Sequence, residues 1–183
     1  QKWFAMKILL TNDDGIHADG LKALYDQCII RHSVTVVAPD RERSAIGHAI
    51  TLNEPIRTTK VNFNGNGFGY AISGTPADCI KFGIMEILSE PPDLVISGIN
   101  AGANVGVNIN YSGTVAAAKE AAIYGFNAIA VSVEAHREPL YKEASIFVER
   151  LAEHVFREGL PMGTFLNVNF PNGPVNKKRS VQI

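Results

Sequence analysis

Two adjacent aspartates, Asp13 and Asp14, follow the apolar run 6–10 and precede Gly15. An apolar run of this kind is typical of a buried strand, so the two carboxylates would stand at a strand end. Like charges at this spacing repel each other, and each is costly to remove from water unless a positive charge lies between them. A hard divalent cation is the simplest such partner, because it prefers oxygen ligands. The pair therefore predicts a metal site at this turn.

Two further oxygen donors follow other predicted strands. Ser44 lies in the polar loop after the strand expected at 34–38, and Asn100 follows the strand expected at 93–97. Parallel strands bring their carboxyl ends to one edge of a sheet, where ligands of open α/β sheets bind. An Asp-Asp-Gly sequence alone is often only a turn, and most loop serines are solvated. Their shared edge is the reason to join Ser44 and Asn100 to the aspartates as one set of metal ligands.

A separate signal for an anion comes from Ser112, Gly113 and Thr114, which open a predicted helix. Unpaired N–H groups and the positive end of the dipole favour an anion at such a terminus. The alternative is that Ser112 or Thr114 merely caps the helix. Neither GxxxxGK[ST] nor GxGxxG occurs in the expected place, so a P-loop and a dinucleotide site are not predicted. His48 could act as an acid–base group, although a lone loop histidine is more often polar surface.

The elements that would position these residues alternate between strands and helices. Apolar strands are expected at 6–12, 34–38, 93–97, 128–133 and 165–170, and helices at 19–32, 76–88, 112–124 and 141–158. This βαβ pattern predicts an α/β fold with a doubly wound, mostly parallel sheet. Residues 50–73 alternate more and contain Asn64-Gly65-Asn66-Gly67, which favours an inserted antiparallel hairpin.

The bulk composition fits one globular domain, which we place at residues 6–183. The chain has 183 residues and a net charge of −1, so no strong attraction to nucleic acid or to an anionic membrane is expected. Cys28 and Cys79 are expected to be buried thiols in a reducing compartment, and no membrane span or signal peptide is visible, which predicts a cytoplasmic protein. Residues 1–5 are expected to be a tag remnant or an N-terminal extension.

Several separate blocks, in order and over nearly the whole chain, resemble the SurE family of survival-protein phosphatases. The blocks are Asn12-Asp13-Asp14-Gly15, Arg43-Ser44, Ser73-Gly74-Thr75-Pro76-Ala77-Asp78-Cys79, the run from Pro92 to Asn100, Gly102, Asn104, Gly106 and the run from Tyr111 to Ala118.

The resemblance implies a metal-dependent phosphatase of nucleoside 5′- and 3′-monophosphates, which in some members also acts on short polyphosphate. By position, the metal ligands of the family fall on Asp13, Asp14, Ser44 and Asn100. Asn104 and the turn from Ser112 to Thr114 fall where the family holds phosphate. The resemblance also implies a Rossmann-like core, an extra hairpin, and a C-terminal extension used in homodimer or homotetramer contacts. This chain ends early within that extension, at a strand expected around 181–183.

The expected mechanism uses Mg²⁺ or Mn²⁺ held by the four ligands. Asp13 or Asp14 would orient or deprotonate the attacking water, and Asn104 with the N–H groups at Ser112 to Thr114 would stabilise the phosphoryl charge. Direct attack by a carboxylate stays open, although the adjacent aspartates do not form the DxD pattern that haloacid-dehalogenase-like phosphatases need. A nucleotide sensor without turnover is the main rival. A nucleic-acid-binding protein is a weak one, because basic and aromatic stripes are absent.

Overall fold

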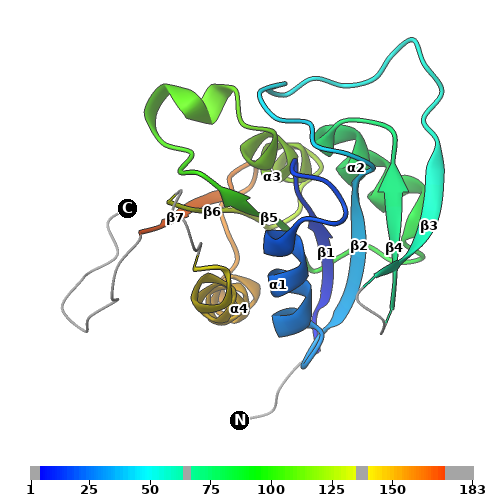
Figure 1. The fold of residues 1–183 in the computed structure, drawn as a ribbon. Coiled ribbons are helices and arrows are strands. Elements are labelled where there is room, and N and C mark those ends of the chain that lie inside the picture. The colour runs from blue at the N-terminus through cyan, green and yellow to red at the C-terminus, as the bar shows by residue number, and fades with distance from the viewer. Residues whose placement is uncertain (1–4, 64–66, 135–139, 172–183) are drawn as a thin grey trace.

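The computed structural model describes residues 5–63, 67–134 and 140–171, which form a seven-stranded sheet with helices on both faces (Figure 1). The strands lie in the order β3-β4-β2-β1-β5-β6-β7, and all neighbours are parallel except β3 and β4, which form an antiparallel hairpin. In chain order they are β1 (Lys7–Thr11), β2 (Ser33–Pro39), β3 (Thr58–Phe63), β4 (Gly67–Ile72), β5 (Leu94–Ala101), β6 (Ala128–Val133) and β7 (Leu166–Phe170). The predicted α/β fold with an inserted hairpin is confirmed.

Two pairs of helices cover the two faces of the sheet. On one face α1 (Asp19–Cys28) packs against α4 (Tyr141–Glu158), and on the other α2 (Pro76–Phe82) packs against α3 (Gly113–Ile123). The chain runs outward from β1 to β2 and the hairpin, and then returns to β5 on the other side of β1. The strand order therefore reverses between β1 and β5. Ligands of such sheets bind at the carboxyl ends of the strands beside that point.

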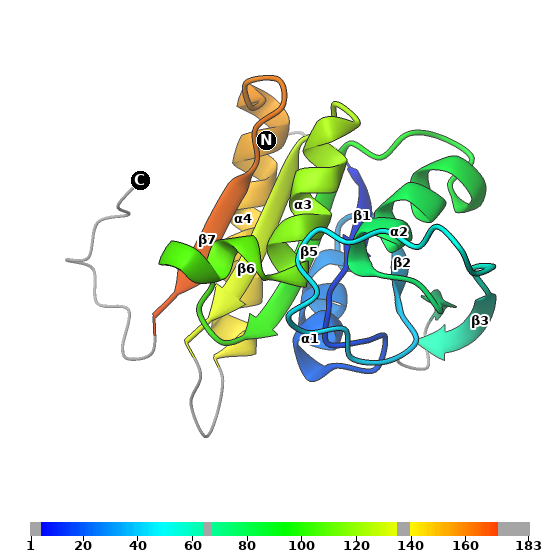
Figure 2. The ribbon, with the colours of Figure 1, turned by 90° about the horizontal axis from the view of Figure 1, so that it is seen from above.

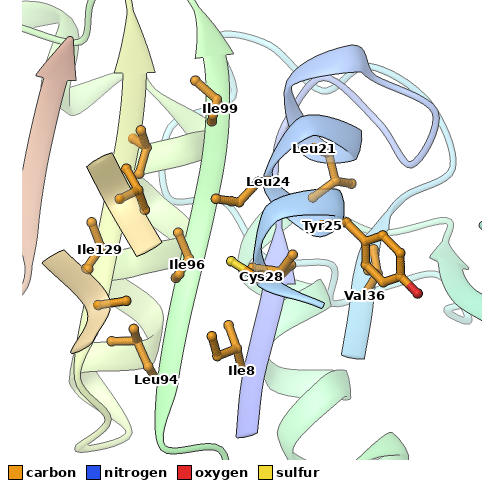
Figure 3. Packing of buried hydrophobic residues seen from close by; sticks show 14 of the residues in the cluster. Ile8, Leu21, Leu24, Tyr25, Cys28, Val36, Leu94, Ile96, Ile99 and Ile129 are labelled. Atoms are coloured by element: carbon orange, nitrogen blue, oxygen red, sulfur yellow. The ribbon is translucent and has the colours of Figure 1, made fainter. Parts of the chain in front are cut away.

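The central strands supply two hydrophobic cores, one on each face. Ile8 and Leu10 of β1 belong to the core under α1 and α4, whereas Leu9 between them belongs to the core under α2 and α3. Figure 3 shows the first core from close by, with Leu21, Leu24, Tyr25 and Cys28 of α1 packed over Ile8, Val36, Leu94, Ile96, Ile99 and Ile129. Burial on both faces explains why these strands are almost continuous apolar runs.

Small side chains bring α3 to the second face. Ala117, Ala118 and Ala121 are fully buried in the same core as Ala128 and Ala130 of β6. Alanine has the best helix propensity, and its small side chain lets a helix backbone lie close to a strand. Because α3 follows β5, its N-terminus begins at the carboxyl edge of the sheet.

Several predicted boundaries match the observed elements. The strand at 128–133 and the helix at 141–158 begin and end as predicted. Thr75 caps α2 in a capping box with Asp78, and Pro76 is the first helical residue. Gly125 follows α3 with a φ of 84°, as a helix-ending glycine does.

Other boundaries differ from the prediction. The helix predicted at 19–32 ends at Cys28, after which Ile29 and Ile30 are exposed. Its buried face stops at Cys28, so nothing holds a further helical turn against the sheet. The helix predicted to reach 88 ends as an α-helix at Phe82 and continues as a π-helical turn, Gly83–Ile87.

Residues 50–53 alternate in sequence but form no strand. Thr51 donates its N–H to the carboxylate of Asp78, and the carbonyl of Ala49 accepts a hydrogen bond from Thr75 Oγ1. The backbone partners of this segment are therefore helix-capping side chains rather than a neighbouring strand. The predicted turn at 64–66, residues 1–4 and the strand expected at 181–183 lie outside the described residues.

No helix in the described parts of the chain combines the length and the apolar character needed to cross a bilayer.

Candidate metal and phosphate site

Asp13 lies directly against the N-terminus of α3. Asp13 is 4% exposed, and the Thr114 hydroxyl donates a hydrogen bond to Asp13 Oδ1. A Cβ on Gly113 would come within 2.7 Å of the Asp13 Cβ and 2.9 Å of Oδ2, so glycine is needed for this approach. Burial raises the pKa of Asp13, while the Thr114 hydroxyl and the N–H groups of Thr114 and Gly113 oppose the rise. The positive end of α3 is thus aimed at Asp13.

Asp14 is half-buried beside Asp13, and its pKa is raised to about 6. Burial is the main cause, and the negative charges of Asp13 and Glu42 add to it. Within the described part of the chain, no lysine, arginine or histidine forms an ion pair with either aspartate. Two neighbouring carboxylates with raised pKa values and no cation from the chain form a site that an external cation would complete.

Asn100 is the third predicted ligand that the structure brings to this pair. The N–H of the next residue, Ala101, faces Asp14 and opposes the rise of its pKa. Asn100 Nδ2 donates to the carbonyl oxygen of Gly102 at 2.7 Å. That bond engages the amide nitrogen, whereas the amide oxygen is the atom that a hard cation would bind.

Ser44 lies close to the same turn, but its hydroxyl points elsewhere. The N–H of Arg43 donates to the carbonyl oxygen of Asp13 at 2.7 Å, which ties the loop after β2 to the loop after β1. Ser44 itself is exposed, and its Oγ donates to Glu42 Oε1 at 2.6 Å. A rotation of the Ser44 side chain is therefore needed before it can join the other three ligands.

Asn12 shapes the turn that carries the aspartates. Its Nδ2 donates to the carbonyl oxygen of Gly15 at 2.9 Å, and the Gly15 N–H donates back to Asn12 Oδ1 at 3.2 Å. Gly15 has a φ of 100°, and a Cβ there would come within 3.1 Å of the Arg41 backbone. This turn therefore needs both an asparagine that closes it and a glycine that leaves room for the neighbouring loop.

Asn104 is held by polar side chains that the sequence analysis did not single out. Its Nδ2 donates to Ser132 Oγ at 2.8 Å, its N–H donates to Asn169 Oδ1 at 2.7 Å, and its carbonyl accepts from Asn167 Nδ2 at 2.9 Å. Ser132 pairs in register with Asn100, so Asn104 lies at the same edge as the predicted ligands. The spacing of Asn167 and Asn169 could have indicated these two partners, because residues two apart lie on the same face of a strand.

The three residues of the predicted phosphate turn have separate structural tasks. Ser112 Oγ accepts the N–H of Val115 at 3.1 Å and so caps α3. Thr114 holds Asp13, and Gly113 leaves room for it. The capping role weighed for Ser112 is observed, although its hydroxyl proton remains able to donate to a ligand.

Tyr141 is a second residue that the sequence analysis missed. Burial and the charges of Asp14 and Asp19 raise the pKa of its phenol, which places the phenol in the field of the candidate site. Its ring also lies 3.1 Å from where a Cβ of Gly20 would be. Since α4 follows β6, its first residue had to lie at the carboxyl edge, and this topological argument could have identified it.

His48 is not placed beside the aspartates. Its Nε2 lies 2.6 Å from Glu120 Oε2, on α3. Glu120 follows Thr114 by six residues, which is about 9 Å along the helix axis at the rise of an α-helix. The alternative that His48 acts as an acid–base group therefore gains no support from its position.

One other group of side chains in the described residues has a spacing that could hold a metal, namely His32, Glu149 and Glu153. It lies at the opposite edge of the sheet, because His32 precedes β2. Arg31 Nη1 lies 3.1 Å from Glu149 Oε1 and 3.2 Å from Glu153 Oε1. A cation of the chain thus already lies between these two carboxylates.

Comparison with known proteins identifies the family. The family model described as "Survival protein SurE" matches residues 8–183. The chain belongs to the SurE family. It is 52% identical over 178 residues to the 5′-nucleotidase SurE of Syntrophobacter fumaroxidans, covering 97% of this chain and 71% of that protein. It is 56% identical over 179 residues to the 5′-nucleotidase SurE of Desulfatibacillum aliphaticivorans, covering 97% and 70%.

A solved SurE structure has the same fold. The crystal structure of the SurE protein from Aquifex aeolicus matches with a TM-score of 0.83 and 41% identity, over 91% of this chain and 66% of that one. The resemblance seen in the sequence is thereby confirmed for the family and for the fold. The chain spans about 70% of the length of the two SurE relatives named above.

Proposed function

We propose that this SurE-family chain is a divalent-metal-dependent phosphomonoesterase that hydrolyses nucleoside 5′-monophosphates to nucleoside and phosphate. The nucleotidase part rests on the names of its relatives. The metal dependence rests on one observation above others. Asp13 and Asp14 are neighbours with raised pKa values, and no cation of the described chain pairs with them. Activity toward 3′-monophosphates and short polyphosphate belongs to the proposal as well.

The donor set fits a hard cation such as Mg²⁺ or Mn²⁺. Asp13, Asp14 and Asn100 would bind it through oxygen atoms, and Ser44 would join them after its hydroxyl leaves Glu42. When bound, such an ion neutralises charge on the phosphoryl group and lowers the pKa of a coordinated water.

The two carboxylates have different environments and hence different tasks. Asp13 is buried and held by Thr114 and the N-terminus of α3, so its orientation is fixed. Asp14 is more exposed, so a water molecule can approach its carboxylate. We assign the proton of the attacking water to Asp14 and the fixed ligand position to Asp13.

The phosphoryl group would lie between this pair and the donors beside it. The Asn104 amide has two hydrogens, of which Ser132 accepts one, and the Ser112 hydroxyl keeps its proton while its oxygen accepts the Val115 N–H. Both groups can therefore donate to phosphate oxygens without losing the bonds that hold them in place. Such preset donors stabilise charge that develops in the transition state.

Phosphate release from AMP with added Mn²⁺ tests the proposal directly. The wild-type chain should release phosphate, and chelation should abolish release. 3′-AMP and tripolyphosphate in parallel reactions test the wider substrate range. Stable AMP binding without phosphate release would instead show a nucleotide sensor. Asp26→Asn, a change of the same kind at an exposed aspartate near the C-terminal end of α1, serves as the matched control for Asp13→Asn.

We also propose a cytoplasmic homodimer or homotetramer. Cys28 and Cys79 are buried free thiols, which agrees with a reducing compartment. The resemblance to SurE proteins supports the assembly. Light scattering on the eluting protein would measure it, and a monomeric mass at micromolar concentration would refute it.

A further inference from the structure

The segment that joins β2 to β3 crosses α3 and α2 before it enters the hairpin (Figure 2). After Asp40, whose N–H donates to the carbonyl of Ile72 in β4, hydrogen bonds connect residues 47–51 to the starts of both helices. The N–H of Gly47 donates to the carbonyl of Tyr111 at 3.0 Å, and the carbonyl of Ala49 accepts from Thr75 Oγ1 at 2.8 Å. Two residues later, Thr51 Oγ1 donates to Asp78 Oδ2 at 2.6 Å. The segment is thus fastened along its length.

The shortest contact to α3 is made by two side chains, His48 and Glu120. The Nε2–Oε2 distance is 2.6 Å, and the side chains are 25% and 12% exposed. A partly buried bond of a carboxylate is stronger than a neutral one at the surface, because solvent screens it less. Within the described residues, this is the side-chain hydrogen bond that joins the segment to α3.

This contact lies four residues after Ser44, at the far end of a short arch. The near end is fixed by Arg43, whose N–H donates to the Asp13 carbonyl at 2.7 Å. Between the two ends the backbone turns sharply, with a φ of 58° at Ala45 and 59° at Gly47. A non-glycine residue at positive φ is held there by its surroundings. The position of Ser44 therefore depends on both fixed ends of the arch.

From these contacts we infer that His48 and Glu120 are positioning residues that hold the Ser44 arch against the aspartate pair. They act through the loop, since Glu120 lies about 9 Å along α3 from Thr114 by helical rise. The inference rests on the proposed function for its link to catalysis, but it concerns the affinity for the cation. Loss of the pair should leave Asp13, Asp14 and Asn100 in place and loosen the loop that carries Ser44, so that its hydroxyl is less able to turn from Glu42 toward the cation.

The test compares His48→Ala, His48→Gln and the exchanged pair His48→Glu with Glu120→His. The matched control is His154→Ala, which removes an exposed histidine from α4. For each protein we would measure Mn²⁺ affinity by paramagnetic resonance of free Mn²⁺, hydrogen exchange of residues 44–51, and kcat and KM for AMP at saturating Mn²⁺.

We expect His48→Ala to weaken Mn²⁺ binding by roughly tenfold, the lower end of the range for residues that orient metal ligands. Exchange at the Gly47 N–H should quicken, and kcat at saturating Mn²⁺ should stay within about threefold of wild type, because enough metal restores the site. His48→Gln and the exchanged pair should recover much of the affinity, and His154→Ala should change nothing.

Unchanged Mn²⁺ affinity in His48→Ala, with or without faster exchange, would overturn the inference. So would a large loss of kcat that saturating Mn²⁺ does not restore, because that result would make His48 a catalytic residue. If wild type binds Mn²⁺ but releases no phosphate, the proposed function fails, whereas the Mn²⁺ affinities still decide the role of the pair.

Discussion

Buried carboxylates at the two edges of the sheet differ in whether the chain supplies a cation to pair with them. At the amino edge, Glu149 is 3% exposed in its side chain and has Arg31 at 3.1 Å. At the carboxyl edge, Asp13 and Asp14 lie side by side and face the N-terminus of α3 and single backbone N–H groups. Neither forms an ion pair within the described residues. A buried charge that serves only stability is paired by the chain itself. A buried pair left without a cation indicates a site for one from outside.

The largest expected effect is on catalysis at the carboxyl edge. Asp13→Asn removes one of the two charges and replaces one carboxylate oxygen by an NH2 group, so phosphate release from AMP should fall by about 1,000-fold, or ~4 kcal/mol. The fold should survive, because an amide fits the same space and a raised pKa means that the charge itself is costly there. Circular dichroism and kinetics together check this, with Asp26→Asn as control. Activity within tenfold of wild type would refute the assignment of Asp13.

The next effect tests the approach of α3 to the aspartates. In Gly113→Ala the added Cβ would meet Asp13 at 2.7 Å and Pro76 at 3.1 Å, so the helix or the turn must shift. Overpacking of this kind costs about 1–3 kcal/mol of folding free energy, and Mn²⁺ affinity should drop with it. Denaturant unfolding and metal titration measure both quantities.

Gly159→Ala is the matched control for that variant, because a Cβ at Gly159 has open space around it although its φ is positive. Equal loss of Mn²⁺ affinity in the two variants would show that the contact between α3 and Asp13 does not matter to the site.

At the amino edge the expected effect is on stability alone. Arg31→Ala leaves Glu149 and Glu153 without their cation, and we expect the free energy of unfolding to fall by about 2 kcal/mol, less than for a fully buried pair because Arg31 is 40% exposed. Phosphate release by the folded protein should not change. Exposed Arg150 offers the control substitution, Arg150→Ala.

The same variant can sharpen the comparison further. Without Arg31, the amino edge becomes like the carboxyl edge, with His32 and two glutamates around an empty position. Added Mn²⁺ should then raise the melting temperature of Arg31→Ala by more than it raises that of wild type, because the variant would have a second cation site. If the rise in melting temperature equals that of wild type, the absence of a pairing arginine or lysine is not what makes a group of carboxylates a metal site in this protein.

The smallest effect concerns Asp14 and pH. Its pKa is about 6 in the fold against 3.8 for the ordinary value, so its protonated form adds stability below pH 3.8, and that stability is lost as pH rises to about 6. Above pH 6 the charged group destabilises the metal-free fold. Asp14→Asn should therefore stabilise the metal-free protein at pH 7.5 by about 1 kcal/mol, after allowance for solvent screening of a half-buried group.

With saturating Mn²⁺, wild type should become more stable than Asp14→Asn, because wild type binds Mn²⁺ more tightly. Thermal unfolding at pH 4 and pH 7.5, each with and without Mn²⁺, measures all four states. A destabilised metal-free Asp14→Asn at pH 7.5 would contradict the raised pKa.

Much of the fold was predictable because each strand is buried on both faces and each helix has an apolar face or a cap. The apolar runs located β1, β2, β5 and β6, and the Thr75-Pro76 pair located the start of α2. Residues 50–53 misled the prediction, because alternation in sequence does not say whether the backbone partner is a strand or a capping side chain such as Asp78.

The candidate site was predictable only as far as strand ends reveal it. Asp13, Asp14 and Asn100 lie at one edge of the sheet because the parallel neighbours β1 and β5 both end there. The contact of Thr114 with Asp13 joins residues 101 positions apart, and the hydrogen bonds of Asn104 join that residue to β6 and β7. Such contacts depend on helix placement and strand register, which local patterns do not determine. Ser44 shows a further limit, since a predicted ligand can bond to a neighbour such as Glu42.

Calorimetric titration with Mn²⁺ at pH 7.5 distinguishes the carboxyl edge from the amino edge as the cation site, using wild type, Asp13→Asn and Glu149→Gln. We expect one Mn²⁺ per chain in wild type, loss of binding in Asp13→Asn, and unchanged binding in Glu149→Gln. Full binding in Asp13→Asn with loss in Glu149→Gln would place the cation at the amino edge and refute its assignment to Asp13 and Asp14.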